Sequence, residues 1–319
     1  MKMVTMRGRR KRPRLSFKTV FFSAVILLVL ILISTEGLML LNMLSLTSPI
    51  ISTPIFAPTI SNKSTASHHC LNEDFQPVQR AAVWTMLNDN LKYVSSAAKM
   101  GRGVEAHTKT PHDLVVMEIE GKPLGDDNWK ILNEVGFKRC VVKSIPPPRR
   151  TRHDLGERFG VLHVWAMTVY DTVLFIDADT LVKKSLDHLI NMDLKGKSIG
   201  VTKDFREGHW VETFNSGVLL VHPSEKEYDR LMTLLRSGIE YEYIMSDQGF
   251  LNVVYKDDWH EIGFLNNANL AVYTKDRKTW DSYNLDDISI IHYTMKKPWN
   301  CAKKARQYGP ICKIWLDAP

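Results

Sequence analysis

The chain has 319 residues, 44% of them hydrophobic, and a formal net charge of +7 from 42 basic and 35 acidic residues. The first 18 positions hold eight of the basic residues: Lys2, Arg7, Arg9, Arg10, Lys11, Arg12, Arg14 and Lys18. The chain beyond this segment holds 34 basic and 35 acidic residues, so the pI of about 9.1 comes from the N-terminal segment. The near-neutral body excludes a broadly basic surface, and we expect no nucleic-acid partner.

An apolar run from Val20 to about Leu41 follows the basic head. Its length suits a bilayer-spanning helix, which needs roughly 20 apolar residues. A cleaved signal peptide is the competing interpretation, but the head and the run are long for one and no Ala-x-Ala-like site is evident. We predict a cytosolic tail (1–19), a signal anchor (20–41) and a single-pass type II protein whose C-terminal body is luminal.

Residues 42–74 are predicted to form a luminal stem linker. Ser, Thr and three prolines (Pro49, Pro54 and Pro58) interrupt any helical or strand period in this stretch. Asn62-Lys63-Ser64 is an N-glycosylation sequon, which is usable only in the secretory lumen.

The cysteines are Cys70, Cys140, Cys301 and Cys312, and no pair has zinc-ligand spacing. In an oxidising lumen, Cys301 and Cys312 could close a small loop near the C-terminus. Cys140 lies in a strand-like run and is interpreted as a small buried hydrophobic residue. The sequence leaves the pairing open.

From about Phe75 onward, strand and helix patterns alternate. The predicted strands are Ala81–Met86, Leu114–Glu118, Arg139–Val142, Val173–Ile176, Ser198–Thr202, Gly217–Val221 and a last strand, Ile288–Tyr293. The predicted helices are Leu91–Met100, Trp129–Val135, Arg158–Met167, Glu225–Leu235 and Asp247–Tyr255, and residues 146–152 are an exposed loop. The alternation predicts an α/β fold in which one domain (75–319) has a mostly parallel sheet flanked by helices.

Asp177 and Asp179 follow the buried strand Val173–Ile176, where the chain leaves the sheet. Residues two apart in extended backbone project to the same side. Ligands bind open sheets beyond the carboxyl ends of their strands. Two hard oxygen donors there predict a site for Mg²⁺ or Mn²⁺ that holds a substrate diphosphate, although Asp-x-Asp also occurs in turns and helix caps.

Three later segments complete a set of polar motifs. Phe214-Asn215-Ser216-Gly217 precedes a predicted strand, and Ser246-Asp247-Gln248-Gly249 opens a predicted helix, where Ser246 would serve as an ordinary N-cap. His292 and Lys297-Pro298-Trp299 follow the last predicted strand. His292 can add a nitrogen to an oxygen-rich metal site, and Lys297 can neutralise phosphate charge.

The order Asp-Ala-Asp, Phe-Asn-Ser-Gly, Asp-Gln-Gly and His-x4-Lys-Pro-Trp, over about Ala81 to Trp299, resembles glycosyltransferase family 8. It is similar to the glycogenin-like branch, which includes glycogenin and the Golgi glucuronosyltransferases of plant xylan. The resemblance implies a GT-A fold and a retaining transferase that moves a sugar, glucuronosyl or glucosyl, from a UDP-sugar to an oligo- or polysaccharide. It also implies Mn²⁺, with Mg²⁺ as the alternative ion, and a Golgi membrane location; a homodimer is compatible with it.

The resemblance assigns roles to residues of this chain. It implies metal ligands at Asp177, Asp179 and His292, catalytic residues at Asp247 and Gln248, and donor contacts at Leu87, Asn88, Tyr93, Asn215, Ser216 and Lys297. Asp247 would lie near the anomeric carbon, as a nucleophile or a positioning group. Retention by a covalent intermediate and retention by same-face attack both stay open.

Two positions depart from the family pattern. Many members carry a donor-contacting lysine where this chain has Val161, and Arg158, one turn earlier, is expected to supply that charge. A glycine usual in the histidine motif is replaced near Met295 or Lys296.

Two alternatives remain at this point. One is glycogenin-like self-glucosylation, with Tyr273 or Tyr283 as acceptor; the predicted anchor disfavours it, since glycogen priming is cytosolic. The other is a catalytically inactive sugar-binding protein, which Val161 favours and the intact acidic motifs oppose. The basic loop at Arg149, Arg150 and Arg152 is interpreted as solvated, with contact to an acidic sugar as the less favoured interpretation.

Overall fold

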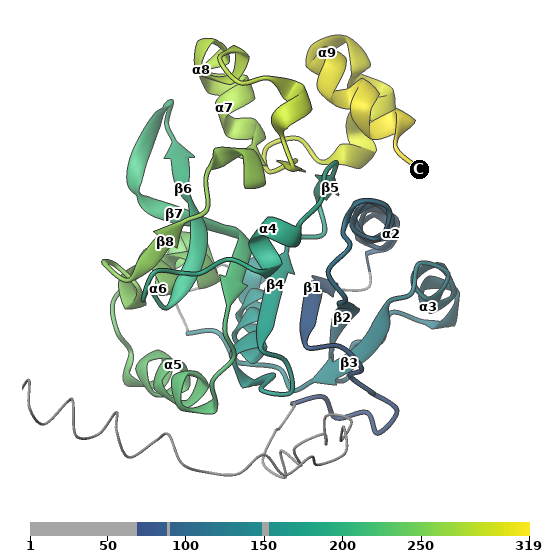
Figure 1. Ribbon diagram of the computed structural model, residues 1–319. Helices are drawn as coiled ribbons and strands as arrows, with labels where there is room; N and C mark the ends of the chain where they lie inside the picture. Colours follow the sequence, from purple (N-terminus) through teal and green to yellow (C-terminus); the bar gives the residue numbers. More distant parts are fainter. Residues whose placement is uncertain (1–68, 88–89, 149–152) are drawn as a thin grey trace, which may run out of the picture. The chain divides into compact units, whose positions relative to one another are not determined.

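A computed structural model describes residues 69–87, 90–148 and 153–319 (Figure 1). The predicted tail, anchor, sequon and most of the stem lie outside these residues, as do Asn88 and the basic loop, so those assignments stay predictions. Within the described residues, no helix combines the length and the apolar character that crossing a membrane requires.

The core of the fold is a seven-stranded sheet in the order β3-β2-β1-β4-β7-β6-β8. Its strands are β1 (Ala81–Leu87), β2 (Asp113–Ile119), β3 (Lys138–Val142), β4 (Thr172–Ile176), β6 (Ile199–Arg206), β7 (His209–Val221) and β8 (Trp259–Glu261). The run β3-β2-β1-β4 is parallel, β7 is antiparallel to both β4 and β6, and β8 is parallel to β6. The predicted mostly parallel sheet is confirmed.

Both faces of this sheet are covered, as the strand sequences require. In β1, Ala82 and Trp84 belong to one apolar cluster, whereas Ala81 and Val83 belong to another on the opposite face. The first cluster takes in the 3₁₀ helix η1 (His153–Ala166), α5 (Glu225–Ser237) and α6 (Ser246–Val254). The second takes in α2 (Leu91–His107), α3 (Asp126–Asn133) and α4 (Asp187–Ile190).

A second, three-stranded sheet has the order β5-β10-β9, formed by β5 (Thr180–Val182), β9 (Ala268–Asn269) and β10 (Ile290–His292). It packs in a third apolar cluster with the C-terminal elements at the top of Figure 1. These are α7 (Leu270–Lys275), α8 (Arg277–Asp281) and α9 (Cys301–Asp317); the short 3₁₀ turns η2 (Tyr243–Met245), η3 (Phe264–Asn266), η4 (Leu285–Asp287) and η5 (Pro298–Asn300) lie in connections. The predicted last strand therefore belongs to a separate sheet, and a 17-residue helix follows it.

Several predicted boundaries were wrong for local reasons. The helix predicted to end at Met100 continues to His107. The helix predicted at Arg158–Met167 is a 3₁₀ helix, in which Gly160 packs so closely that a Cβ there would lie 2.7 Å from the sulfur of Met86. The strand predicted from Gly217 begins at His209, because Glu207 and Gly208 have φ values of +53° and +90° and close a tight hairpin with β6.

All four cysteines are paired. Cys301 and Cys312 form the small C-terminal loop that the sequence allowed. The interpretation of Cys140 as a simple buried hydrophobic residue was wrong, because Cys140 forms a disulfide with Cys70. This bond ties the segment before β1 to β3 and closes a long loop, which restricts the unfolded chain.

Candidate functional site

The two carboxylates of the Asp-Ala-Asp motif lie where β4 leaves the sheet. All five residues of β4 are buried, so the strand position is fixed from both faces. The backbone N–H of Asp177 donates to the Gly217 carbonyl on the adjacent strand at 2.8 Å. The chain then turns through Ala178 into β5, which begins at Thr180. Both acids therefore occupy the carboxyl edge of the sheet, as predicted.

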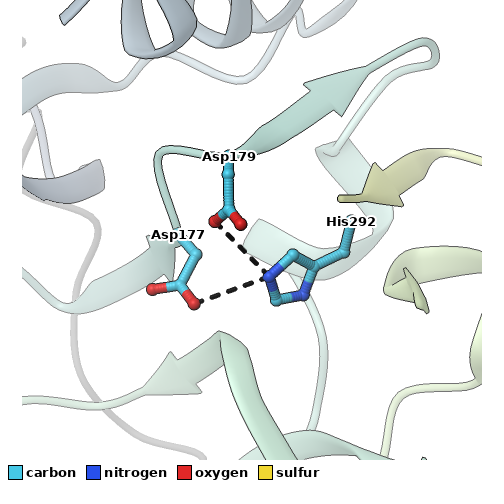
Figure 2. A group of neighbouring side chains, drawn as sticks. All are labelled: Asp177, Asp179 and His292. Carbon is cyan, nitrogen blue, oxygen red and sulfur yellow. Dashed lines mark ion pairs between the residues drawn. The ribbon is translucent and has the colours of Figure 1, made fainter. Parts of the chain in front are cut away.

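Strand pairing in the second sheet places His292 beside these acids. It is the last residue of β10 and pairs with Thr180 of β5, directly after Asp179. The N–H of the next residue, Tyr293, donates to the Asp179 carbonyl at 2.9 Å. As Figure 2 shows, the imidazole Nε2 faces both carboxylates, 3.6 Å from Asp177 Oδ2 and 3.6 Å from Asp179 Oδ1.

This cluster fits a divalent cation. One ligand atom from each of the three residues lies within 4.8 Å of the others. Neighbouring ligands around an octahedral ion of the Mg²⁺ type lie about 3 Å apart, so a small inward shift would bring these groups into contact with one ion. Carboxylate oxygens with one imidazole suit Mg²⁺ or Mn²⁺ better than a soft metal.

Lys297 lies beside the cluster and bonds to the Asp179 carboxylate oxygen that does not face His292. Its ammonium donates to Asp179 Oδ2, whereas Oδ1 faces His292. Burial opposes ionisation of Asp179, but the neighbouring His292 and the charge of Lys297 outweigh burial and hold the pKa of Asp179 below its usual range. Asp179 therefore stays a carboxylate, ready to bind a cation.

Arg158 of η1 joins the two acidic motifs. Its Nε donates to Asp247 Oδ1 at 3.0 Å, and one terminal nitrogen is 3.2 Å from each oxygen of Asp177. Val161 is 2% exposed and lies in the apolar cluster, so that position offers no charge to the site. Arg158 thus brings a guanidinium to the acids, and its contact with a donor stays a prediction.

The Asp247 carboxylate, which Arg158 contacts, also bonds to Ser216. Asp247 lies in the first turn of α6, 2% exposed, and its Oδ2 accepts from the Ser216 hydroxyl at 3.4 Å. Burial, followed by the charge of Asp177, raises the pKa of Asp247 even though Arg158 opposes the shift. The predicted Ser246 N-cap was wrong: Met245 is the N-cap of α6, with no side-chain cap bond, and Ser246 has a φ of +53°.

Side-chain amides, of which Gln248 and Asn267 are buried, form a continuous line beside the acids. Asp204 accepts from Gln248 at 3.0 Å, Gln248 accepts from Asn215 at 3.1 Å, Asn215 accepts from Asn267 at 2.9 Å, and Asn267 bonds to His292 Nδ1 at 2.9 Å. Asn215 and Gln248 were predicted site residues. Asp204 and Asn267 were missed, because neither belongs to a motif and the fold alone brings them here.

A cleft opens in front of these groups. Its lining includes Leu87, Tyr93, Arg158, Asp177 and Asp179. Tyr93 is half-buried, makes an edge contact with Trp299 at 4.7 Å between ring centroids, and has Lys297 above its ring at 5.9 Å. The described residues of the predicted site thus gather at one edge of the sheet.

The two tyrosines of the self-glucosylation alternative lie in the third apolar cluster. Tyr273 is 8% exposed, and its hydroxyl donates to the Tyr308 carbonyl at 3.3 Å. Tyr283 packs on Phe264 with ring centroids 4.6 Å apart. The burial of Tyr273 removes it as an acceptor in this conformation.

Residues 161–302, which hold the acidic, asparagine and histidine motifs of the site, match the family model Glycosyl transferase family 8. This stretch of the chain is similar to glycosyltransferase family 8. UDP-glucuronate:xylan alpha-glucuronosyltransferase 1 of Arabidopsis thaliana is 28% identical over 231 residues, covering 70% of this chain and 33% of that protein. Human glycogenin-1 is 25% identical over 230 residues, covering 67% of this chain and 61% of that protein. The chain thus spans about a third of the xylan relatives it matches.

Two solved glycosyltransferase structures have a fold similar to that of this chain. The galactosyltransferase LgtC, in complex with donor and acceptor sugar analogues, has a TM-score of 0.55 at 19% identity and covers 74% of this chain and 94% of its own. The apo-form glycosyltransferase GlyE of Streptococcus pneumoniae TIGR4 has a TM-score of 0.54 at 20% identity, covering 76% of this chain and 60% of its own. The fold is GT-A-like.

Proposed function

We propose that this domain transfers a sugar from a UDP-sugar to a glycan acceptor, with retention of configuration and with Mn²⁺ as the preferred ion. The observation that carries the proposal is the convergence of Asp177, Asp179 and His292 beside Lys297 and Arg158. A cluster of acids with adjacent cations suits a diphosphate held through a metal ion. A hydrolase that works with two carboxylates has no need of that cation set.

The charges of the site support departure of a nucleoside diphosphate. Bound to Asp177, Asp179 and His292, a divalent ion would supply Lewis-acid stabilisation of the charge on the leaving diphosphate. The ammonium of Lys297, which pairs with Asp179, adds a fixed positive charge beside this site. Arg158 carries a charge that can turn from Asp177 toward the donor when Asp177 engages a cation.

Asp247 is the proposed reaction-centre carboxylate, with Gln248 beside it. Arg158 and Ser216 hold its two oxygens, so its position is fixed before substrate binds. Asn215 and Ser216 lie on the same edge and are proposed to contact the donor sugar. Leu87 and Tyr93 line the cleft and are proposed to receive the uridine, together with Asn88 from the adjoining turn.

Glucuronate is the first sugar to test, and glucose the second. The names of several relatives specify UDP-glucuronate and xylan, at 25–29% identity. Arg158 lies in the cleft with a guanidinium that matches carboxylate geometry. The acceptor is proposed to be an oligo- or polysaccharide, and the location the Golgi membrane, through the predicted anchor at residues 20–41.

The test is release of UDP by the purified full-length chain, with a panel of UDP-sugars and xylan fragments, with and without Mn²⁺. Donor-specific, Mn²⁺-dependent release that is lost in Asp179→Asn supports the proposal. Asp193→Asn is the matched control, since the Asp193 side chain is 70% exposed and pairs with Lys195. Binding of neither UDP nor Mn²⁺ by the wild-type chain would overturn the proposal.

A further inference from the structure

The line of amides ends on His292, the nitrogen ligand of the proposed metal site. Asn267 is fully buried, and its Oδ1 lies at hydrogen-bonding distance, 2.9 Å, from His292 Nδ1. The opposite ring nitrogen, Nε2, faces Asp177 and Asp179 (Figure 2). Only a nitrogen without a proton can bind a metal, so the hydrogen bond at Nδ1 decides whether Nε2 is available.

Backbone groups fix the direction of each amide in this line. The Gly217 N–H donates to Asn215 Oδ1 at 3.0 Å, so the oxygen of Asn215 must face Gly217. Asn267 Nδ2 donates to that same oxygen at 2.9 Å. The oxygen of Asn267 then points at His292 and can only accept. When the imidazole is neutral, His292 Nδ1 must therefore carry its proton, and Nε2 is left with a lone pair.

The other end of the line is fixed in the same way. The Ser216 N–H donates to Gln248 Oε1 at 3.3 Å, next to the bond from Asn215. Gln248 Nε2 donates to Asp204 Oδ2, and the Phe205 N–H donates to Asp204 Oδ1 at 2.9 Å. Asp204 is 3% exposed, and burial raises its pKa. Asn215 and Gln248 cannot turn over without losing a bond to the backbone or to Asp204, and turning Asn267 would place its oxygen against that of Asn215.

We propose that Asn267 is a positioning residue that sets the Nδ1–H tautomer of His292 and thereby presents Nε2 to a divalent cation. It receives its own orientation from Gly217 through Asn215. Asn267 touches neither the donor nor the ion; it acts through His292. The metal-affinity part of this inference rests on the proposed metal-dependent function, whereas the tautomer is a property of the chain alone.

The tautomer is measured directly, without metal, by ¹⁵N NMR of the full-length chain labelled at histidine. The His292→Gln spectrum identifies the His292 signals. At a pH where the His292 ring is neutral, we expect a protonated Nδ1 and an unprotonated Nε2 in the wild type, and loss of this preference in Asn267→Leu. Asn267→Asp keeps an acceptor opposite Nδ1 and is expected to restore the wild-type tautomer.

Mn²⁺ binding to the same variants, without donor or acceptor, gives the second readout. Partners that orient a metal ligand typically change affinity by about 10- to 100-fold, and we expect a loss of that size in Asn267→Leu and recovery in Asn267→Asp. Asn266→Leu is the matched control, because this neighbouring buried asparagine bonds to His188 and the Ile262 carbonyl instead.

The outcomes separate the two proposals. A neutral wild-type His292 ring with its proton on Nε2, or unchanged tautomer and Mn²⁺ affinity in a folded Asn267→Leu, overturns the role of Asn267. If Asn267→Leu does not fold, the wild-type tautomer and Asn267→Asp decide instead. Loss of Mn²⁺ affinity in Asn267→Asp despite a wild-type tautomer counts against a link between the His292 tautomer and Mn²⁺ affinity. A wild type with the Nδ1–H tautomer that binds no Mn²⁺ overturns the metal-dependent function and the metal-affinity part, but leaves the tautomer assignment standing.

Discussion

Gly217 and His292 are in contact so close that no side chain fits between them. A Cβ at position 217 would lie 2.1 Å from Cε1 of His292 and 2.6 Å from its Nδ1. The glycine in Phe-Asn-Ser-Gly therefore leaves room for the imidazole, in addition to its hydrogen bonds to Asn215 and Asp177.

The substitution Gly217→Ala is expected to push His292 away from the carboxylates and to weaken Mn²⁺ binding by about tenfold or more. Mn²⁺ titration of the purified chain measures the effect. Gly200→Ala is the matched control: it lies in β6 of the same sheet, and a Cβ there meets the Leu194 and Ile262 side chains at 2.9 and 3.0 Å. Equal losses of Mn²⁺ affinity in the two variants would refute a specific contact with His292.

Removal of the Lys297 charge is expected to move two affinities in opposite directions. In the free protein Lys297 neutralises Asp179, so Lys297→Met should leave that carboxylate free for a cation and raise Mn²⁺ affinity. The same change removes a charged donor to the diphosphate and should weaken UDP binding by about tenfold or more. Separate Mn²⁺ and UDP titrations check both signs. Lys313→Met, which removes an exposed partner of Asp317, serves as the control.

Arg158→Met is expected to lower kcat/KM by about 100-fold, because Asp177 and Asp247 both lose their cation. A second change, Val161→Lys, restores the residue usual in the family but should not rescue activity. Val161 is buried among apolar side chains, and an unpaired ammonium there is costly. UDP release and thermal unfolding of both variants are the measurements. Rescue without loss of stability would contradict this prediction and show that position 161 can present a charge to the site.

His163 predicts a pH dependence of stability. Burial lowers the pKa of His163 to about 4, whereas histidine in an unfolded chain titrates near 6.5. Between these values the unfolded chain binds the extra proton, so this contribution is complete above about pH 6.5 and is lost as the pH falls toward 4. The loss reaches about 3 kcal/mol.

Denaturant unfolding of His163→Gln across this pH range measures the effect. Glutamine can still donate to the Lys143 carbonyl, which His163 Nε2 contacts at 2.9 Å, so the variant isolates the titration. We expect a flatter dependence of the free energy of unfolding on pH than in the wild type. His209→Gln, at an exposed position, is the control. Identical pH slopes for His163→Gln and wild type would contradict the prediction.

Local sequence determined most strands of the first sheet and its carboxyl edge. Short, branched, apolar runs such as Val173–Ile176 are buried on both faces, and polar residues after them must lie at the strand end. The Asp177 and Asp179 site follows from that pattern alone. The motif order also identified the family, since each motif contributes side chains that the site chemistry needs.

Tertiary structure decided what those motifs contact. Cys70 reaches Cys140 across 70 residues, and no local pattern encodes such a pairing. His292 meets Asp179 because β10 pairs with β5 in a second sheet, and Asn267 meets His292 because β9 pairs with β10. Periodicity describes one element at a time, whereas strand pairing across more than 100 residues depends on how buried faces fit together. The acids could thus be predicted from the sequence, but the orientation of their histidine partner depends on the fold.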